Sequence, residues 1–205
     1  MKKAGGKQYL SFERSPEFGA VIMALIRLAG LDDVVKVEIG SSDASIMRAY
    51  RAGVLKHIDM MFLDHYKPAY TTDLKLCEEL KLVTPGSVMA ADNVIKPGNP
   101  PYLEYVRSSV EEKRKAAQQT NGETGKADSR FADKTAGQYA KRQGEEKLNM
   151  SKGNPNLVYK SELVHSFEPT GVPVSQSSRG FSAVTDEFIG WRGDHALHWR
   201  GSISV

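Results

Sequence analysis

Two short apolar runs that end in oxygen-bearing side chains limit the possible folds of this chain more than any other feature. Residues 62–68 read Phe-Leu-Asp-His-Tyr-Lys-Pro, and residues 90–97 read Ala-Ala-Asp-Asn-Val-Ile-Lys-Pro. Such runs are expected where neighbouring parallel strands, buried on both faces, deliver side chains to one crevice at their carboxyl ends. The two stretches therefore predict paired parallel strands with a polar site at one edge of a sheet.

The segment from residue 8 to residue 93 alternates strand-like and helix-like patterns. Apolar or β-branched runs predict strands at 8–13, 34–39, 57–64 and 87–91. Between these strands we expect three helices: one capped by Ser15 and stopped at Gly30, one that ends near Gly53, and one over 70–80. Strands and helices in this order predict an α/β fold with helical crossovers.

Length, charge and cysteine content set the broad class. A chain of 205 residues is long enough for one domain, and its net charge of +3 comes from basic residues interleaved with acidic ones, which does not indicate nucleic-acid binding. The lone Cys77 suits a reducing compartment. No apolar run approaches the roughly 18 residues of a membrane span. We expect a cytoplasmic protein without nucleic-acid, membrane or obligate protein partners.

The second half of the chain departs from this pattern. Apolar residues are sparse over about 107–153, for which we expect a charged helical extension to Gln119 and then a flexible loop. An alternative is that this segment is an arm that docks on an acidic partner. A last strand is expected within 156–168. Residues 174–205 are rich in Ser and Gly, so we expect a domain over 1–173 followed by an unrelated, disordered tail.

The polar residues at the two strand ends suggest a metal site with a neighbouring base. Asp64, Asp92 and Asn93 offer two carboxylates and an amide oxygen, which suit Mg²⁺ better than zinc. Lys67 lies three residues beyond Asp64. A partly desolvated lysine can lose its proton near neutral pH and act as a base. The alternatives are a solvated surface lysine, and carboxylates that only cap the following helices.

Three motifs together resemble a known family. They are Phe-Leu-Asp-His-Tyr-Lys at 62–67, Ala-Asp-Asn-Val-Ile-Lys-Pro at 91–97 and Ser-Phe-Glu-Pro-Thr-Gly-Val-Pro at 166–173. They resemble catechol O-methyltransferase, particularly fungal-type members, and the match covers about residues 2–109 and 154–173. The resemblance implies a Rossmann-like sheet and transfer of a methyl group from S-adenosylmethionine to one hydroxyl of a catechol chelated by Mg²⁺.

The resemblance also implies a role for particular residues. Asp64, Asp92 and Asn93 would bind Mg²⁺, and Lys67 would take the proton from the attacking hydroxyl. Glu168 would hydrogen-bond the hydroxyl that is not methylated, and Pro97 would belong to an apolar gate over the catechol ring. The implied substrate-binding set is thus Lys67, Asn93, Pro97 and Glu168. The implied cofactor-binding set is Glu13 at the ribose, Ser42 and His65 around the adenine, and Asp64.

The chain departs from the family pattern at two places. The glycine-containing loop that cradles the methionine part of the cofactor, and the strand before it, would precede Met1. The family's last strand, beside the strand that carries Asp92, would be replaced by the unrelated tail. We therefore expect an incomplete sheet with its first and last strands missing, and weak binding of S-adenosylmethionine by this chain alone.

Two other functions remain open at this point. The first is a non-catalytic remnant, from truncation or a mis-assembled gene, that retains only the metal and catechol half. The second is a Mg²⁺-dependent enzyme of another reaction, such as phosphoryl transfer. No Gly-Lys-Ser/Thr phosphate loop occurs in the sequence, which weighs against the second.

Overall fold

The computed structural model describes residues 5–119, 131, 148–164 and 181–185. Strands and helices alternate as far as β4, in the order β1 (Tyr9–Glu13), α1 (Pro16–Leu28), β2 (Val35–Ile39), α2 (Ser42–Arg51), β3 (Met60–Leu63), α3 (Ala69–Glu79) and β4 (Val88–Asp92). The π-helical turn η2 (Val94–Gly98) and the helices α4 (Pro100–Arg107) and α5 (Val110–Gln119) come next. Two strands follow, β5 (Lys160–Val164) and β6 (Phe181–Thr185). The α/β class predicted from the sequence is confirmed.

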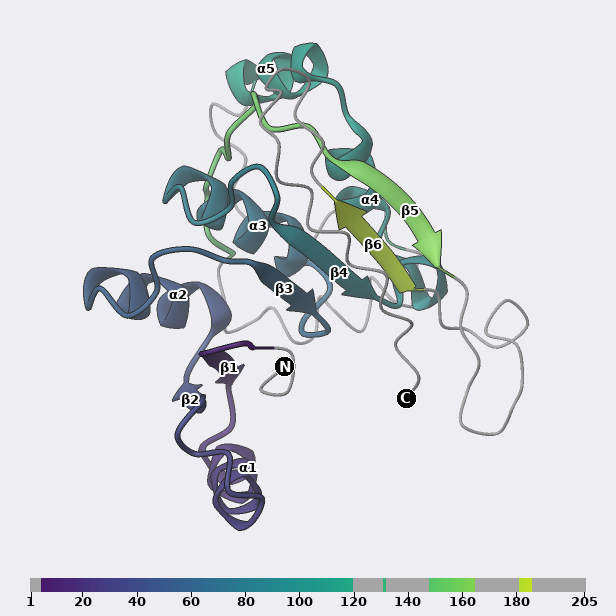
Figure 1. The fold of residues 1–205 in the computed structure, drawn as a ribbon. Helices are drawn as coiled ribbons and strands as arrows, with labels where there is room; N and C mark the ends of the chain where they lie inside the picture. The colour runs from purple at the N-terminus through teal and green to yellow at the C-terminus, as the bar shows by residue number, and fades with distance from the viewer. Residues whose placement is uncertain (1–4, 120–130, 132–147, 165–180, 186–205) are drawn as a thin grey trace.

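The strands form two sheets (Figure 1). One sheet contains β1 and β2, which pair in parallel, and the other has the order β3-β4-β6-β5. β3 and β4 are parallel, with Leu63 opposite Ala91, whereas β6 is antiparallel to both β4 and β5. The expected parallel pair with polar strand ends is therefore present, and no strand joins β1 to β3 within the described residues.

The position of β6 corrects one expectation. We expected the place beside the strand that carries Asp92 to be empty and the tail to contribute no strand, but Phe181 pairs with Asp92 on one side and with Val164 on the other. An unpaired β4 would leave a row of buried backbone donors and acceptors without partners. The run Phe-Ser-Ala-Val-Thr that forms β6 contains no Gly or Pro, which suits a strand. Residues 174–180 and 186–205 lie outside the described part.

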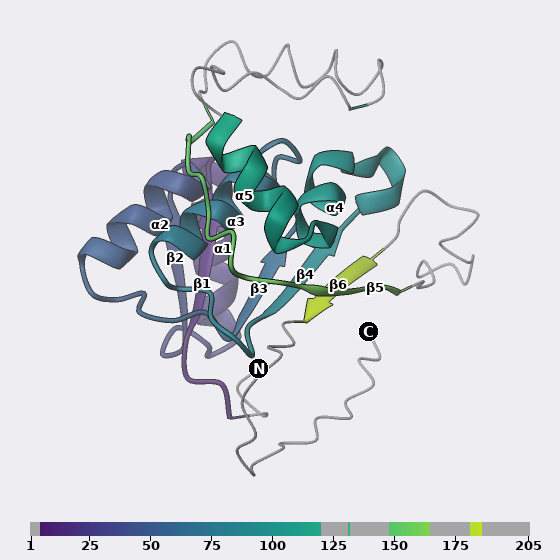
Figure 2. The same cartoon turned by 90° about the horizontal axis from the view of Figure 1, so that it is seen from above.

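The main hydrophobic core lies between the larger sheet and its helices. In Figure 2, α3, α4 and α5 lie on the same side of this sheet. The core is made by side chains of β3, β4 and the helices around them, among which the fully buried ones include Ile46, Leu63, Tyr70, Leu74, Leu82, Met89, Val94, Tyr102 and Val106. Leu157 and Tyr159, from the segment before β5, also belong to it.

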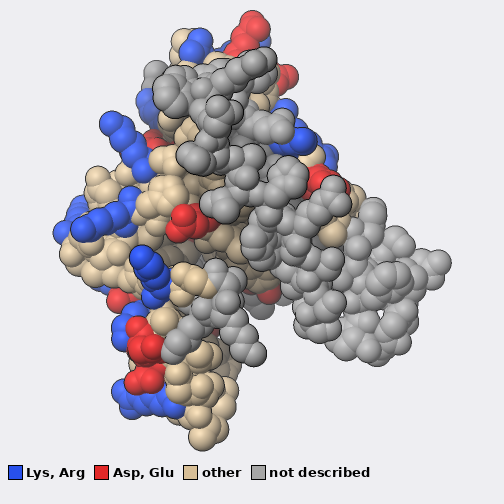
Figure 3. All heavy atoms as spheres, in the orientation of Figure 1, with Lys and Arg blue, Asp and Glu red and all other residues tan. Residues whose placement is uncertain are grey.

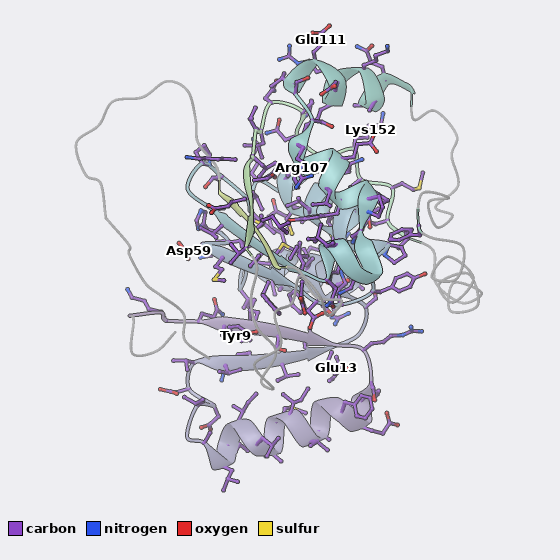
Figure 4. The ribbon with its side chains drawn as sticks, turned by 90° about the vertical axis from the view of Figure 1, so that its right-hand side faces the viewer. Tyr9, Glu13, Asp59, Arg107, Glu111 and Lys152 are labelled. Atoms are coloured by element: carbon purple, nitrogen blue, oxygen red, sulfur yellow. The ribbon has the colours of Figure 1, made fainter. Side chains whose placement is uncertain are left out.

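The β1-α1-β2 unit extends from one end of the molecule (Figures 1 and 4). Ser15 caps α1 as expected, because its hydroxyl accepts the Phe18 N–H at 3.2 Å. Gly19 lies where α1 packs on β2, and a Cβ atom there would meet the end of the Ile39 side chain.

For the charged region after α4, the structure tests one of the two predictions made from the sequence. α5 confirms the helical extension that ends at Gln119. The loop expected after it lies outside the described residues, apart from Phe131 and residues 148–153. Among the described helices, none combines the length and the apolar character that a membrane crossing requires.

Candidate active site at the ends of β3 and β4

Asp64 and Asp92 lie side by side at the carboxyl ends of two paired strands. Leu63 of β3 is opposite Ala91 of β4 in the parallel register, so the residues that follow them, Asp64 and Asp92, are also neighbours. Adjacent strands are about 4.8 Å apart. The side chain of Asp64 is 48% exposed, so a ligand can reach it from solvent. The sequence-predicted carboxylate pair is therefore brought together.

Asn93 is held at the site by an unusual backbone conformation. Its φ of 59° and ψ of 30° are left-handed, a region that Asn tolerates better than most residues. This conformation allows the chain to turn from β4 directly into η2, and the Asn93 N–H donates to Asp92 Oδ1 at 2.7 Å. Single π-helical turns occur frequently at functional sites.

The donor set fits a hard divalent cation. Asp64, Asp92 and Asn93 present carboxylate and amide oxygens, which Mg²⁺ prefers, and include neither imidazole nor thiolate. Within the described residues, no group of three or more His, Cys, Asp and Glu side chains is placed to hold a metal ion. Two carboxylates and an amide could hold Mg²⁺ together with water and substrate oxygens, as is usual for this ion.

Lys67 is buried at the edge of this carboxylate pair. Its side chain is 9% exposed, so the alternative interpretation of Lys67 as a solvated surface lysine is wrong. Lys67 Nζ donates to Asp64 Oδ1 at 3.2 Å and to Tyr70 Oη at 2.6 Å, and it lies 4.8 Å from the centre of the Tyr70 ring. The buried Asn99 fixes the backbone here by donating to the Lys67 carbonyl at 2.8 Å.

Tyr70 is a site residue that the sequence analysis missed. Its hydroxyl accepts from Lys67 and donates to the Asp92 carbonyl at 3.4 Å, so it connects the base to the neighbouring strand. The ring stacks on His65, with centroids 4.9 Å apart, and meets the edge of Tyr102 at 5.8 Å. A signal was present, because Tyr70 is three residues from Lys67, a separation that can bring side chains together at a helical turn.

Two of the predicted cofactor residues meet at a shared partner. Ser42, the first residue of α2, donates its hydroxyl to Asp73 Oδ2, and His65 Nε2 lies 2.9 Å from the same oxygen. Asp73 belongs to α3 and is 1% exposed. The sequence analysis did not single it out, because a carboxylate on an amphipathic helix is usually solvated.

Glu13 lies in the smaller sheet, at the carboxyl end of β1 (Figure 4). Its carboxylate accepts the Ser15 N–H at 2.8 Å, and its carbonyl accepts the Gly40 N–H at 2.9 Å, two residues before Ser42. Glu13 is thus near the turn that carries Ser42. The side chain of Pro97 and the whole of Glu168 lie outside the described part, so their roles stay predictions.

Comparison with known proteins supports a methyltransferase relationship. No protein-family model matches the chain. The chain is 40% identical to catechol O-methyltransferase of Bos taurus over 104 residues, which are 51% of this chain and 38% of that protein. It is 39% identical to catechol O-methyltransferase B of Danio rerio over 104 residues, 51% of this chain and 39% of that protein. It is 38% identical to the transmembrane O-methyltransferase of Homo sapiens over 104 residues, 50% of this chain and 36% of that protein.

The chain spans about two fifths of the length of these relatives. Among solved structures, an O-methyltransferase from Bacillus cereus is similar with a TM-score of 0.47 and 19% identity, covering 88% of this chain and 63% of that one. A Podospora anserina methyltransferase has a TM-score of 0.47 and 14% identity, covering 88% of this chain and 61% of that one. The narrower fungal-type assignment stays a prediction.

Proposed function

We propose that this chain carries the metal and substrate half of a Mg²⁺-dependent O-methyltransferase that transfers the methyl group of S-adenosylmethionine to a catechol hydroxyl. The observation that carries the proposal is the convergence of Asp64, Asp92 and Asn93 beside a buried Lys67. These residues come from two adjacent strand ends, where open α/β sheets bind their ligands. The relatives named catechol O-methyltransferase support the choice of reaction.

The three oxygen ligands would hold the cation. Held there, Mg²⁺ would make a bound catechol hydroxyl more acidic and fix its direction. The exposed carboxylate of Asp64 lies within reach of solvent, whereas Asp92 is partly buried and hydrogen-bonded to Asn93. The chain thus presents a partly buried, hydrogen-bonded carboxylate on β4 and a more accessible one after β3.

Lys67 is placed to accept the proton of the hydroxyl. As the hydroxyl oxygen forms its bond to the methyl carbon, the carbon–sulfur bond of the sulfonium breaks and the electron pair remains on sulfur. The hydroxyl proton passes to Lys67 Nζ, which must have a free electron pair to accept it, and later to solvent. Tyr70 and Asn99 hold Lys67 from its two ends, one at Nζ and one at the carbonyl. Positioning of this kind supplies much of the rate in transfers between bound partners.

The competing functions make different demands on these residues. Phosphoryl transfer requires phosphate-binding amides or a cationic clamp, and the sequence contains no Gly-Lys-Ser/Thr loop. A non-catalytic remnant that retains the metal and catechol half would keep the same contacts of Lys67, so only methyl transfer by the chain separates the remnant from an enzyme.

The test measures methyl transfer to a simple catechol with the purified chain, at millimolar S-adenosylmethionine, in Mg²⁺ or in excess EDTA. We expect product only in Mg²⁺. A parallel NMR titration measures catechol binding under the same two conditions, and binding should also require Mg²⁺. Product formed equally in EDTA would contradict the metal assignment. Catechol binding that ignores Mg²⁺ would contradict the substrate assignment, and resorcinol, whose hydroxyls cannot chelate, is the matched control ligand.

A further inference from the structure

Three polar side chains from distant parts of the chain converge on one buried carboxylate. Asp73 Oδ2 accepts from the Ser42 hydroxyl and lies 2.9 Å from His65 Nε2. Asp73 Oδ1 accepts from Asn149 Nδ2 at 2.9 Å. The three partners come from the start of α2, the turn after β3 and the segment that precedes β5. Asp73 is therefore the point at which these three segments meet.

The contacts with Asp73 Oδ2 fix both the position and the orientation of Ser42 and His65. His65 is held at Nε2 by Asp73, and its ring plane is held by stacking on Tyr70 at 4.9 Å. Ser42 stands at the start of α2, where its hydroxyl reaches into the core rather than toward its own helix end. An ionised carboxylate only accepts hydrogen bonds, so it imposes one donor direction on each partner.

We propose that Asp73 is the residue that positions Ser42 and His65 for the nucleoside half of S-adenosylmethionine. Asn149 hydrogen-bonds the other oxygen of the Asp73 carboxylate. This inference rests on the proposed function, and it adds a residue and a chain segment to that site. Asp73 is a positioning residue, since its oxygens are turned toward protein partners and its side chain is 1% exposed.

The segment that follows Asn149 is fastened to the same helix. Glu79 Oε1 accepts the Lys152 N–H, and it accepts the Gly153 N–H at 3.1 Å. Glu78 Oε2 accepts the Asn154 N–H at 2.7 Å. Acidic side chains along α3 thus hold residues 149–154 from the middle of the helix to its end, and Figure 4 shows Lys152 at the side of the helical layer. Asn149 is the member of this segment that reaches Asp73, the shared partner of Ser42 and His65.

The experiment uses 5′-methylthioadenosine, which carries the adenine, ribose and sulfur but no methionine chain. Its binding to the whole chain is measured by NMR titration, which detects millimolar dissociation constants. Asp73→Asn should weaken binding roughly tenfold or more, the cost of about one well-placed hydrogen bond. Asp59→Asn is the matched control, because that side chain is 99% exposed, and it should bind like the unsubstituted chain.

A double-variant cycle separates positioning from general loss of structure. If Asp73 acts through Ser42 and His65, Asp73→Asn should have little further effect once Ser42→Ala and His65→Gln are present. A full tenfold loss in that background would overturn the proposal. Equal binding by the unsubstituted chain and Asp73→Asn would overturn the role of Asp73 alone. An unsubstituted chain that does not bind 5′-methylthioadenosine would overturn the nucleoside assignment of Ser42 and His65 together with it.

A spectroscopic readout on the unsubstituted chain avoids the risk that Asp73→Asn fails to fold. Because a carboxylate accepts, the neutral His65 ring should carry its proton on Nε2, which ¹⁵N chemical shifts of the ring nitrogens report directly. A proton on Nδ1 instead would mean that His65 does not donate to Asp73, and that result would overturn the proposal.

Discussion

The β1-α1-β2 unit and the β3-α3-β4 unit contain similar elements but are buried to very different degrees. The second supplies most of the fully buried side chains of the core, whereas in α1 a stripe of apolar residues is exposed: Phe18 by 65%, Val21 by 59%, Leu25 by 58% and Leu28 by 85%. Figure 3 shows mostly uncharged surface where α1 lies. The proposed metal and substrate residues Asp64, Lys67 and Asp92 thus stand on the well-packed unit, and Glu13 stands on the exposed one.

The two units are joined near the predicted nucleoside residues. The Glu13 carbonyl accepts the Gly40 N–H, and Ser42, two residues later, donates to Asp73 of the packed unit. The proposed metal and catechol half can therefore be rigid regardless of the state of α1. The nucleoside half depends on contacts that cross between the units, so substitutions in the two halves should have different consequences.

The largest effect is expected at the proposed metal ligands of the packed unit. Asp64→Ala removes a charged oxygen ligand and should reduce methyl transfer roughly 10³-fold or more, by loss of transition-state stabilisation rather than of substrate affinity alone. Methyl transfer is measured across a Mg²⁺ series. The control is Asp59→Ala, an exposed carboxylate just before β3. A substituted enzyme with unchanged activity and unchanged Mg²⁺ dependence would remove Asp64 from the ligand set.

The next effect tests the buried amine of the same unit. Lys67→Met keeps the apolar stem but removes Nζ, so it should lower the rate by roughly 10²–10⁴, the usual contribution of a positioned base. Catechol and Mg²⁺ binding, measured by titration, should change little. Tyr70→Phe keeps Lys67 and removes only one of its partners, and we expect a smaller loss. A pH–rate profile that Lys67→Met leaves unaltered would argue that the amine is not the base.

The residues whose positions could be predicted from the sequence share one property. Their positions are determined by the pattern of residues next to them in the chain. Asp64 and Asp92 follow apolar strands, and Ser15 precedes Pro16 at a helix start, so their places follow from neighbours in the chain. Asp73 and Glu78 look like ordinary helical acids, and only tertiary packing buries them. The pairing of β6 with β4 joins residues about ninety positions apart, and no local signal reports it.

Matched leucines test the difference in burial itself. Leu74 in α3 is fully buried and Leu28 in α1 is 85% exposed. Leu74→Ala should cost about 2–5 kcal/mol of unfolding free energy through lost burial and a residual cavity. Leu28→Ala should change it by at most about 0.5 kcal/mol. Urea denaturation of both variants gives the comparison. A comparable loss at Leu28 would show that the apolar stripe of α1 is covered in solution.

The smallest effect concerns a buried acid at the far end of α3 from the site. Glu78 is 1% exposed and accepts hydrogen bonds from the hydroxyls of Tyr105 and Tyr159 and from the Asn154 N–H. Lys113 Nζ lies 4.4 Å and 4.5 Å from the centres of the two tyrosine rings. Burial raises the pKa of Glu78, and the hydrogen bonds and the charge of Lys113 oppose that rise without cancelling it.

The raised pKa of Glu78 gives a stability change with a definite sign. Between the ordinary pKa of 4.5 and the raised one, the folded chain binds more protons than the unfolded chain. This contribution to stability is fully present below the lower value and is lost as the pH rises through the higher one. The difference in unfolding free energy between the unsubstituted chain and Glu78→Gln should therefore shift in favour of the glutamine as pH rises. Urea midpoints at stepped pH measure it, with the exposed Glu111→Gln as control (Figure 4). A difference that stays constant with pH would mean that Glu78 titrates alike in the folded and unfolded chains.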